Sequence, residues 1–252
     1  IVRMGYMFNY NSAGERMANN TIKSNSFSIR AGLESAGNVM YAISNLTKLS
    51  KNSDGEYSLL SIPYAQYVKG DFDFSRNIVI DDKNAIAYHV GVGIAVPYGN
   101  SKSIPYIKQY FSGGANSVRG WSVRELGPGS FPGDGNYLNQ SGDIKFDASI
   151  EYRSKLFWLL QGALFVDAGN IWTIKEYENQ PGGQFDISKF YKQIAFAYGL
   201  GIRIDLDYLV FRIDGGMKAL NPAYSSGKQR YPILNPNFKR DFTFHLAVGY
   251  PF

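Results

Sequence analysis

The chain has 252 residues, a formal net charge of +5, 15% aromatic residues, 27 glycines, two histidines and no cysteine. The lack of cysteine excludes a disulfide framework and a thiolate metal site, and two histidines far apart in the chain leave little for zinc chemistry. Basic residues are scattered among acidic ones, which argues against a nucleic-acid-binding surface, and no apolar run of about 18 residues is present to form a membrane-spanning helix.

The first part of the chain contains four segments in which apolar residues alternate with small, polar or charged ones. In the clearest, Val90, Val92 and Ile94 alternate with glycine and alanine. Such alternation is typical of a β-strand with two different faces. The four predicted strands are 2–10, 26–33, 62–74 and 86–96, joined by links at 11–21, 35–57 and 75–84, and the link at 35–57 is predicted to hold a short helix at Val39–Leu49.

Five more alternating segments follow a connection that has no helix or strand period. In the second of them, Leu164 and Val166 lie opposite Phe165 and Asp167. Tight turns and long loops alternate between the segments. The predicted strands are 144–153, 158–169, 196–205, 209–218 and 242–252, joined by turns at 154–157 and 207–208 and by loops at 173–193 and 220–241.

These segments predict about nine strands, each near the length that crosses a bilayer at a tilt. A soluble β-sandwich binding module also buries one apolar face and stays an alternative. However, the strands are long for a sandwich, and short turns at one rim oppose long loops at the other. We therefore predict an all-β fold, a transmembrane antiparallel up-and-down β-barrel, with residues 1–252 as the C-terminal part of the barrel domain. Because bacterial barrels usually have an even strand count, we expect earlier strands to precede Ile1.

The connection at 98–143 is unusually long, and such loops in compact domains are mostly functional or disordered. It contains aromatic residues, which disordered linkers lack, and Gly113, Gly114 and Gly120 permit a tight backbone on both sides of Arg119. A solvated arginine in a turn is the ordinary interpretation of an isolated Arg-Gly pair. In this setting we expect Arg119 to reach a partner.

Three motifs, in the same order, resemble a known family. Val118-Arg119-Gly120-Trp121 resembles the Val-Arg-Gly-Phe/Tyr motif in the sixth extracellular loop of the outer-membrane assembly proteins typified by BamA and TamA, a motif that two-partner secretion transporters share. Trp121 replaces the commoner Phe or Tyr, and the POTRA repeats and early strands of the family are absent. The other two motifs resemble the strand motif after this loop, at Phe165, Asp167 and Gly169, and the aromatic-ended insertion signal of outer-membrane proteins, at Phe244, Leu246, Val248, Tyr250 and Phe252.

The resemblance covers essentially the whole chain and implies the last nine or so of about sixteen strands. It implies a non-enzymatic barrel of the bacterial outer membrane, without cofactor or metal, that assembles, inserts or translocates other polypeptides. The implied partners are outer-membrane lipids and lipopolysaccharide, unfolded outer-membrane protein clients and accessory lipoproteins, with no nucleic acid among them.

Strand parity places Glu151 and Asp167 on the polar face of neighbouring strands. In the family, the loop arginine folds into the barrel and pairs with acids at such positions, so the resemblance implies pairing of Arg119 with Asp167 and with Glu151 as a second acceptor. The planar guanidinium suits two carboxylates. The alternative is that Asp167 pairs with Arg153 or Arg203 on adjacent strands.

The implied mechanism is a weak seam between the first and last strands of the barrel. Pro251 lacks a backbone donor and would impair pairing, although it is also an ordinary strand end. An unpaired edge can accept an incoming strand. Alternatives are a two-partner-type secretion pore and the barrel anchor of a surface or fused patatin-like enzyme. An enzyme built on His89 or His245 is disfavoured, since His89 has no Ser/Asp constellation around it in the sequence.

Overall fold

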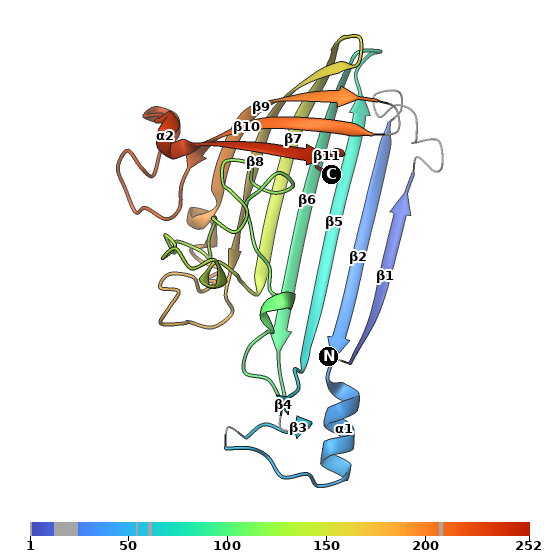
Figure 1. Cartoon of the computed structure of the whole chain (residues 1–252), viewed down its shortest axis with the longest axis vertical. Helices are drawn as coiled ribbons and strands as arrows, with labels where there is room; N and C mark the ends of the chain where they lie inside the picture. The colour runs from blue at the N-terminus through green and yellow to red at the C-terminus, as the bar shows by residue number, and fades with distance from the viewer. Residues whose placement is uncertain (1, 13–24, 54, 60–61, 207–208) are drawn as a thin grey trace.

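The computed structural model describes residues 2–12, 25–53, 55–59, 62–206 and 209–252. Within these ranges nine strands form one curved antiparallel sheet in the order β1-β2-β5-β6-β7-β8-β9-β10-β11 (Figure 1). This confirms the predicted all-β up-and-down architecture. The sheet is part of a barrel, because its described end strands do not pair with each other. The strands are β1 (Arg3–Asn11), β2 (Ser26–Ala36), β5 (Tyr67–Val79), β6 (Asn84–Pro97), β7 (Ile144–Phe157), β8 (Leu160–Trp172), β9 (Ala195–Asp205), β10 (Val210–Leu220) and β11 (Phe242–Val248).

The two faces of the sheet differ as the alternation predicts. On β6, Val92 and Ile94 are 45% and 47% exposed on the outer face, whereas Ala85 and Ala95 are fully buried on the inner face. The outer face therefore exposes a continuous apolar surface, and the inner face collects the charged and small residues. This pattern is the reverse of a soluble sheet that hides its apolar side.

The two rims of the sheet differ in the length of their connections. One rim has short turns at 80–83 and 158–159, and the other has the loops 98–143, 173–194 and 221–241, which confirms the predicted alternation. The predicted helix at Val39–Leu49 is present as α1 (Asn38–Leu46) at the long-loop rim. Among the described residues, no α-helix is both long and apolar enough to cross a membrane. The remaining short elements are β3 (Ser58–Leu59), β4 (Ile62–Pro63), η2 (Tyr106–Lys108), η3 (Tyr137–Asn139), η4 (Phe190–Gln193), η5 (Pro232–Leu234) and α2 (Phe238–Asp241).

The predicted strand at 62–74 and the turn at 154–157 have the wrong bounds. Residues 62–63 belong to the separate β3–β4 pair, and β5 starts only at Tyr67 because Asn100 and Ser101 bind the backbone of Tyr64 and Gln66. At the other end, β7 continues to Phe157, so the turn is 158–159. The predicted turn at 207–208 and residues 13–21 of the predicted link at 11–21 lie outside the described residues.

The end of the chain also differs from the prediction of one outward aromatic row at 242–252. The strand β11 stops at Val248, because Gly249 takes a left-handed backbone with φ of 86°. Phe244, Leu246 and Val248 face outward and are exposed. The last residues turn inward instead: the Arg153 guanidinium lies 4.4 Å from the ring centre of Tyr250 and 5.5 Å from that of Phe252.

Candidate functional site

The long loop 98–143 folds back onto the concave face of the sheet (Figure 1). Two positive-φ glycines, Gly113 and Gly114, turn the backbone before the tip. At the tip the loop meets the sheet so closely that a Cβ added to Gly216 of β10 would lie 2.1 Å from the carbonyl oxygen of Arg119. Glycine in the sheet therefore makes room for the backbone of the loop.

Arg119 lies at the centre of the interior and is 1% exposed. Its Nε and Nη2 atoms each donate to Asp167 at 2.8 Å, and its backbone N–H donates to the same carboxylate at 3.0 Å. Its Nη1 donates to Glu151 at 2.6 Å. The ring of Phe165 packs against the guanidinium, with its centre 3.4 Å from the guanidinium carbon. The structure thus brings the loop arginine together with both acids named from the sequence.

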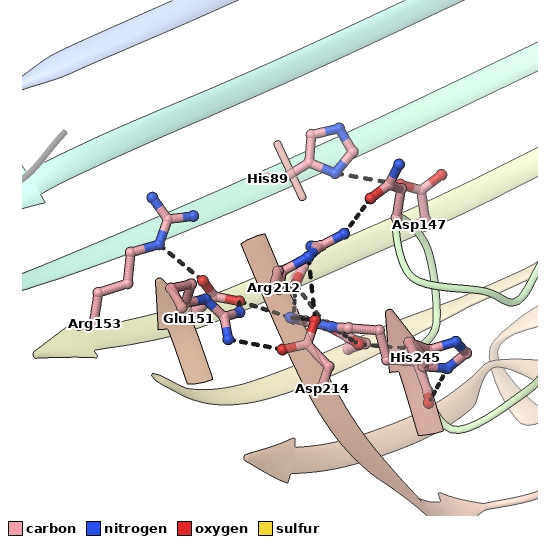
Figure 2. A network of polar contacts seen from close by, with 12 residues as sticks. His89, Asp147, Glu151, Arg153, Arg212, Asp214 and His245 are labelled. Carbon is pink, nitrogen blue, oxygen red and sulfur yellow. Dashed lines mark hydrogen bonds and ion pairs between the residues drawn. The ribbon is translucent and has the colours of Figure 1, made fainter. Parts of the chain in front are cut away.

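The network extends beyond these three residues. Arg153 and Arg203, the alternative partners of Asp167, donate to Glu151 at 2.8 Å and 2.9 Å. Arg203 also donates to Asp214 at 2.7 Å, and Arg212 approaches Asp214 at 3.4 Å. Figure 2 shows Glu151 beside Arg153 and Asp214 beside Arg212. The network therefore contains four arginines and three carboxylates, and one of these carboxylates, Asp167, is bound by Arg119.

The strands β10 and β11 also bind the loop tip. His245 of β11 contacts the Arg119 carbonyl oxygen at 2.9 Å through Nε2, and Thr243 donates to the Gly120 carbonyl at 3.0 Å. Arg212 donates to Asn116 at 2.5 Å. The tip is thus bound to β7, β8, β10 and β11 at once, which makes it a brace across the C-terminal half of the sheet.

The remaining motif residues pack around this brace. Val118 and Trp121 are buried in one apolar cluster with Leu126 and two alanines of β9. Gly169 lets the sheet approach Val118, whose Cγ2 would lie 3.1 Å from an added Cβ. All three positions of the strand motif, Phe165, Asp167 and Gly169, thereby line the same inward face against the loop.

A second ion pair fixes the continuation of the loop. Lys218 of β10 donates to Glu125 at 2.9 Å and lies 5.2 Å above the Trp121 ring centre. Burial alone would raise the pKa of Glu125, but Lys218 and Ser122 hold it below its ordinary value. The Glu125 carboxylate therefore stays charged at neutral pH.

Sequence reasoning missed several members of the network. Arg203 was expected only as an alternative partner of Asp167, His245 was considered only as a disfavoured catalytic residue, and Arg212 and Asp214 were assigned no role. Part of the signal was present: charged residues occupy inward positions at matching heights on paired strands, as Arg212 and Arg203 do in the β9–β10 register. Parity places such residues on one face but does not choose among several possible partners.

The second histidine belongs to a separate cluster. His89 lies 3.2 Å from Asp73 and 3.3 Å from Asp147, and it stacks on Phe252 with ring centres 5.5 Å apart. No group of three or more metal-ligating side chains occurs in the part of the chain that the structure describes.

Comparison with known proteins finds a matching family model and similar proteins. The model of the Omp85 superfamily domain matches residues 52–252. The outer membrane protein assembly factor BamA of Neisseria meningitidis serogroup B is 35% identical over 97 residues, which are 35% of this chain and 12% of that protein. The sorting and assembly machinery component 50 homolog of Homo sapiens is 26% identical over 159 residues, 57% of this chain and 32% of that protein.

A solved structure is also similar. The crystal structure of BamA from Haemophilus ducreyi lacking POTRA domains 1–3 has a TM-score of 0.49 and 15% sequence identity, and the match covers 98% of this chain and 54% of that one. The chain thus spans about half of that structure, and no more than about a third of the length of the curated relatives that it matches.

Proposed function

This chain belongs to the Omp85 superfamily of membrane β-barrels, and on that premise we propose that it inserts or translocates other polypeptides at the bacterial outer membrane. The names of its relatives support this direction, since one is an outer membrane protein assembly factor and another a component of a sorting and assembly machinery. The clients would be unfolded outer-membrane proteins, with accessory lipoproteins as further partners. The bacterial relative, at 35% identity, favours the bacterial over the mitochondrial outer membrane.

The observation that carries the proposal is the contrast between the two edges of β11. One edge pairs with β10 from Phe211↔Val248 to Met217↔Phe242. The other edge makes no ladder among the described residues. In the whole barrel the expected earlier strands would lie beside this edge, and the proposal is that their pairing with β11 is weak, so that an incoming strand can add there by β-augmentation.

The direction of the backbone groups on β11 follows from one hydrogen bond. The Gly249 N–H donates to the Val210 carbonyl of β10 at 2.7 Å. Because antiparallel ladders alternate, the N–H groups of Ala247 and His245 also point to β10. Those of Leu246 and Val248 point to the open edge.

This direction gives a specific test of the template. Leu246→Pro removes one donor from the open edge and leaves the β10 ladder intact, whereas Leu246→Ala keeps the donor and removes the same exposed side chain. We expect the proline variant to insert a denatured β-barrel client into vesicles up to about tenfold more slowly, because one ladder hydrogen bond contributes about 0.5–1.5 kcal/mol. The alanine variant should insert it at nearly the unmodified rate.

The measurement is protease protection of the client in vesicles that contain the full chain. Equal rates for the proline and alanine variants would contradict the template. Release of the client into the vesicle interior, instead of its insertion, would favour the secretion pore.

A further inference from the structure

The outer face of β8, β9 and β10 is hollowed into an apolar groove of about 890 Å³ next to the long-loop rim. Its floor includes Leu164, Leu200 and Met217, and its outer wall is formed by Pro236, Phe238 and Phe242. The groove lies on the outer side of the sheet and is separate from the charge network of the interior.

The residues that form the wall of the groove are held in place by contacts with one another. Asn237 caps α2 by accepting from the N–H groups of Lys239 and Arg240, and Asp241 accepts from the Asn237 N–H at 2.9 Å. The rings of Phe238 and Phe242 lie 5.4 Å apart.

The wall overhangs the sheet. On the outer face of β10, Phe211 and Ile213 are 44% and 38% exposed, but Met217 is only 8% exposed. The loop 221–241 therefore covers the end of an otherwise open apolar face and leaves a bounded hollow beneath it.

The wall combines this apolar surface with positive charge. The segment 221–241 contains four basic residues, Lys228, Arg230, Lys239 and Arg240, and one acidic residue, Asp241. Arg240 is bound to Asp241 at 2.7 Å, and Arg230 donates to the Lys192 carbonyl at 3.0 Å. Lys239 follows Phe238 directly, is exposed and makes no ion pair among the described residues. An exposed cation thus directly follows a residue of the groove wall in the chain.

We propose that this groove binds one acyl chain of a membrane phospholipid with a net negative headgroup, with Lys239 contacting that headgroup. The inference rests on the membrane location in the proposed function. The continuity of the groove with the lipid-exposed outer face supports an acyl chain, and the basic character of the segment that supplies its wall supports an anionic headgroup. A zwitterionic lipid or a partner protein would occupy the same place without this charge dependence.

The test uses the full chain in phosphatidylcholine vesicles that contain a minor fraction of phosphatidylglycerol with a photo-reactive group on its acyl chain. After illumination, mass spectrometry identifies the labelled peptides. Leu200→Trp places a large ring in the groove, and Leu200 is already 64% exposed, so the fold should tolerate it. The matched control, Ile213→Trp, puts the same ring on the outer face of β10 outside the groove lining.

We expect labelling of the peptide that contains Phe238 in the unmodified chain and in Ile213→Trp, and its loss in Leu200→Trp. Lys239→Gln should lower labelling by phosphatidylglycerol about fivefold, because one basic side chain near an anionic lipid contributes on that order. The same variant should not change labelling by phosphatidylcholine with the same photo-reactive chain.

Equal labelling of Leu200→Trp and the unmodified chain would overturn the groove as an acyl site. Equal labelling by the two lipids in the unmodified chain would overturn recognition of the net negative headgroup. A defect of Leu200→Trp in client insertion with unchanged lipid labelling would assign the groove to a protein. Client insertion is measured on the same vesicles, so its absence with intact labelling would contradict the proposed function and leave the lipid site standing.

Discussion

Arg119→Ala is expected to destabilise the folded chain by about 3–5 kcal/mol, the usual cost of removing one partner from a buried ion pair. Asp167 would keep the Ser149 hydroxyl and the backbone N–H of residue 119, but it would lose its only cation among the described residues. Glu151 would keep Arg153 and Arg203. The measurement is the midpoint of urea unfolding of the chain in lipid vesicles.

The double variant tests whether the two residues act as a pair. Asp167→Ala leaves the guanidinium without its two-pronged partner, whereas Arg119→Ala with Asp167→Ala removes both buried charges. We expect the double variant to be less destabilised than the sum of the single ones. Arg119→Lys retains the charge without the planar fork, so its loss of stability should lie between zero and that of Arg119→Ala. Additive losses would show that Arg119 and Asp167 do not stabilise each other.

Gly216→Ala is expected to displace the loop tip from the interior. The added Cβ would meet the Arg119 carbonyl oxygen at 2.1 Å and its carbonyl carbon at 2.6 Å, both backbone atoms that cannot rotate away. Overpacking of this kind costs about 1–3 kcal/mol, and moving the tip also breaks the guanidinium contacts. We expect trypsin to cleave after Arg119 in this variant, because that bond is buried in the unmodified chain.

The neighbouring glycine provides the control for this substitution. A Cβ added to Gly215 faces outward and meets the ring of Phe242 at 3.0 Å, a side chain that can shift. Gly215→Ala should therefore leave the bond after Arg119 protected. If the bond after Arg119 stays protected in both variants, the sheet must shift to accommodate the Cβ added at Gly216. If trypsin cleaves it in both, the substitutions destabilise the whole chain.

Most of the fold was predictable because the side-chain period of a strand is readable from the sequence. The outer row of β6, with Val92 and Ile94, alternates so regularly that the strand and its facing were both evident. The family was also predictable, from motifs whose order matched. Boundaries were less predictable where local pattern and tertiary contact disagree, as at Tyr67, where hydrogen bonds from another loop delay the start of the strand.

Two features had no adequate local signal. The turn after Phe157 uses Trp158 with φ of 53°, a conformation for which the usual markers are glycine or asparagine. The inward course of the last residues depends on Arg153, which is distant in sequence from Tyr250 and Phe252. In the interior, parity gave the facing of Arg203 and Asp214, but only the assembled sheet shows that Arg203 pairs with both Glu151 and Asp214 and that Asp214 also approaches Arg119 at 3.6 Å.

The attachment of the loop tip to β11 has a consequence for the order of assembly. Arg119 and Gly120 are held by residues 126 and 123 positions later in the chain. A growing polypeptide cannot complete this brace until Thr243 and His245 of β11 are present, and contacts between such distant residues form slowly. We expect chains that end before β11 to leave the guanidinium unburied and open to quality-control proteases, so that docking of the arginine reports completion of the sheet.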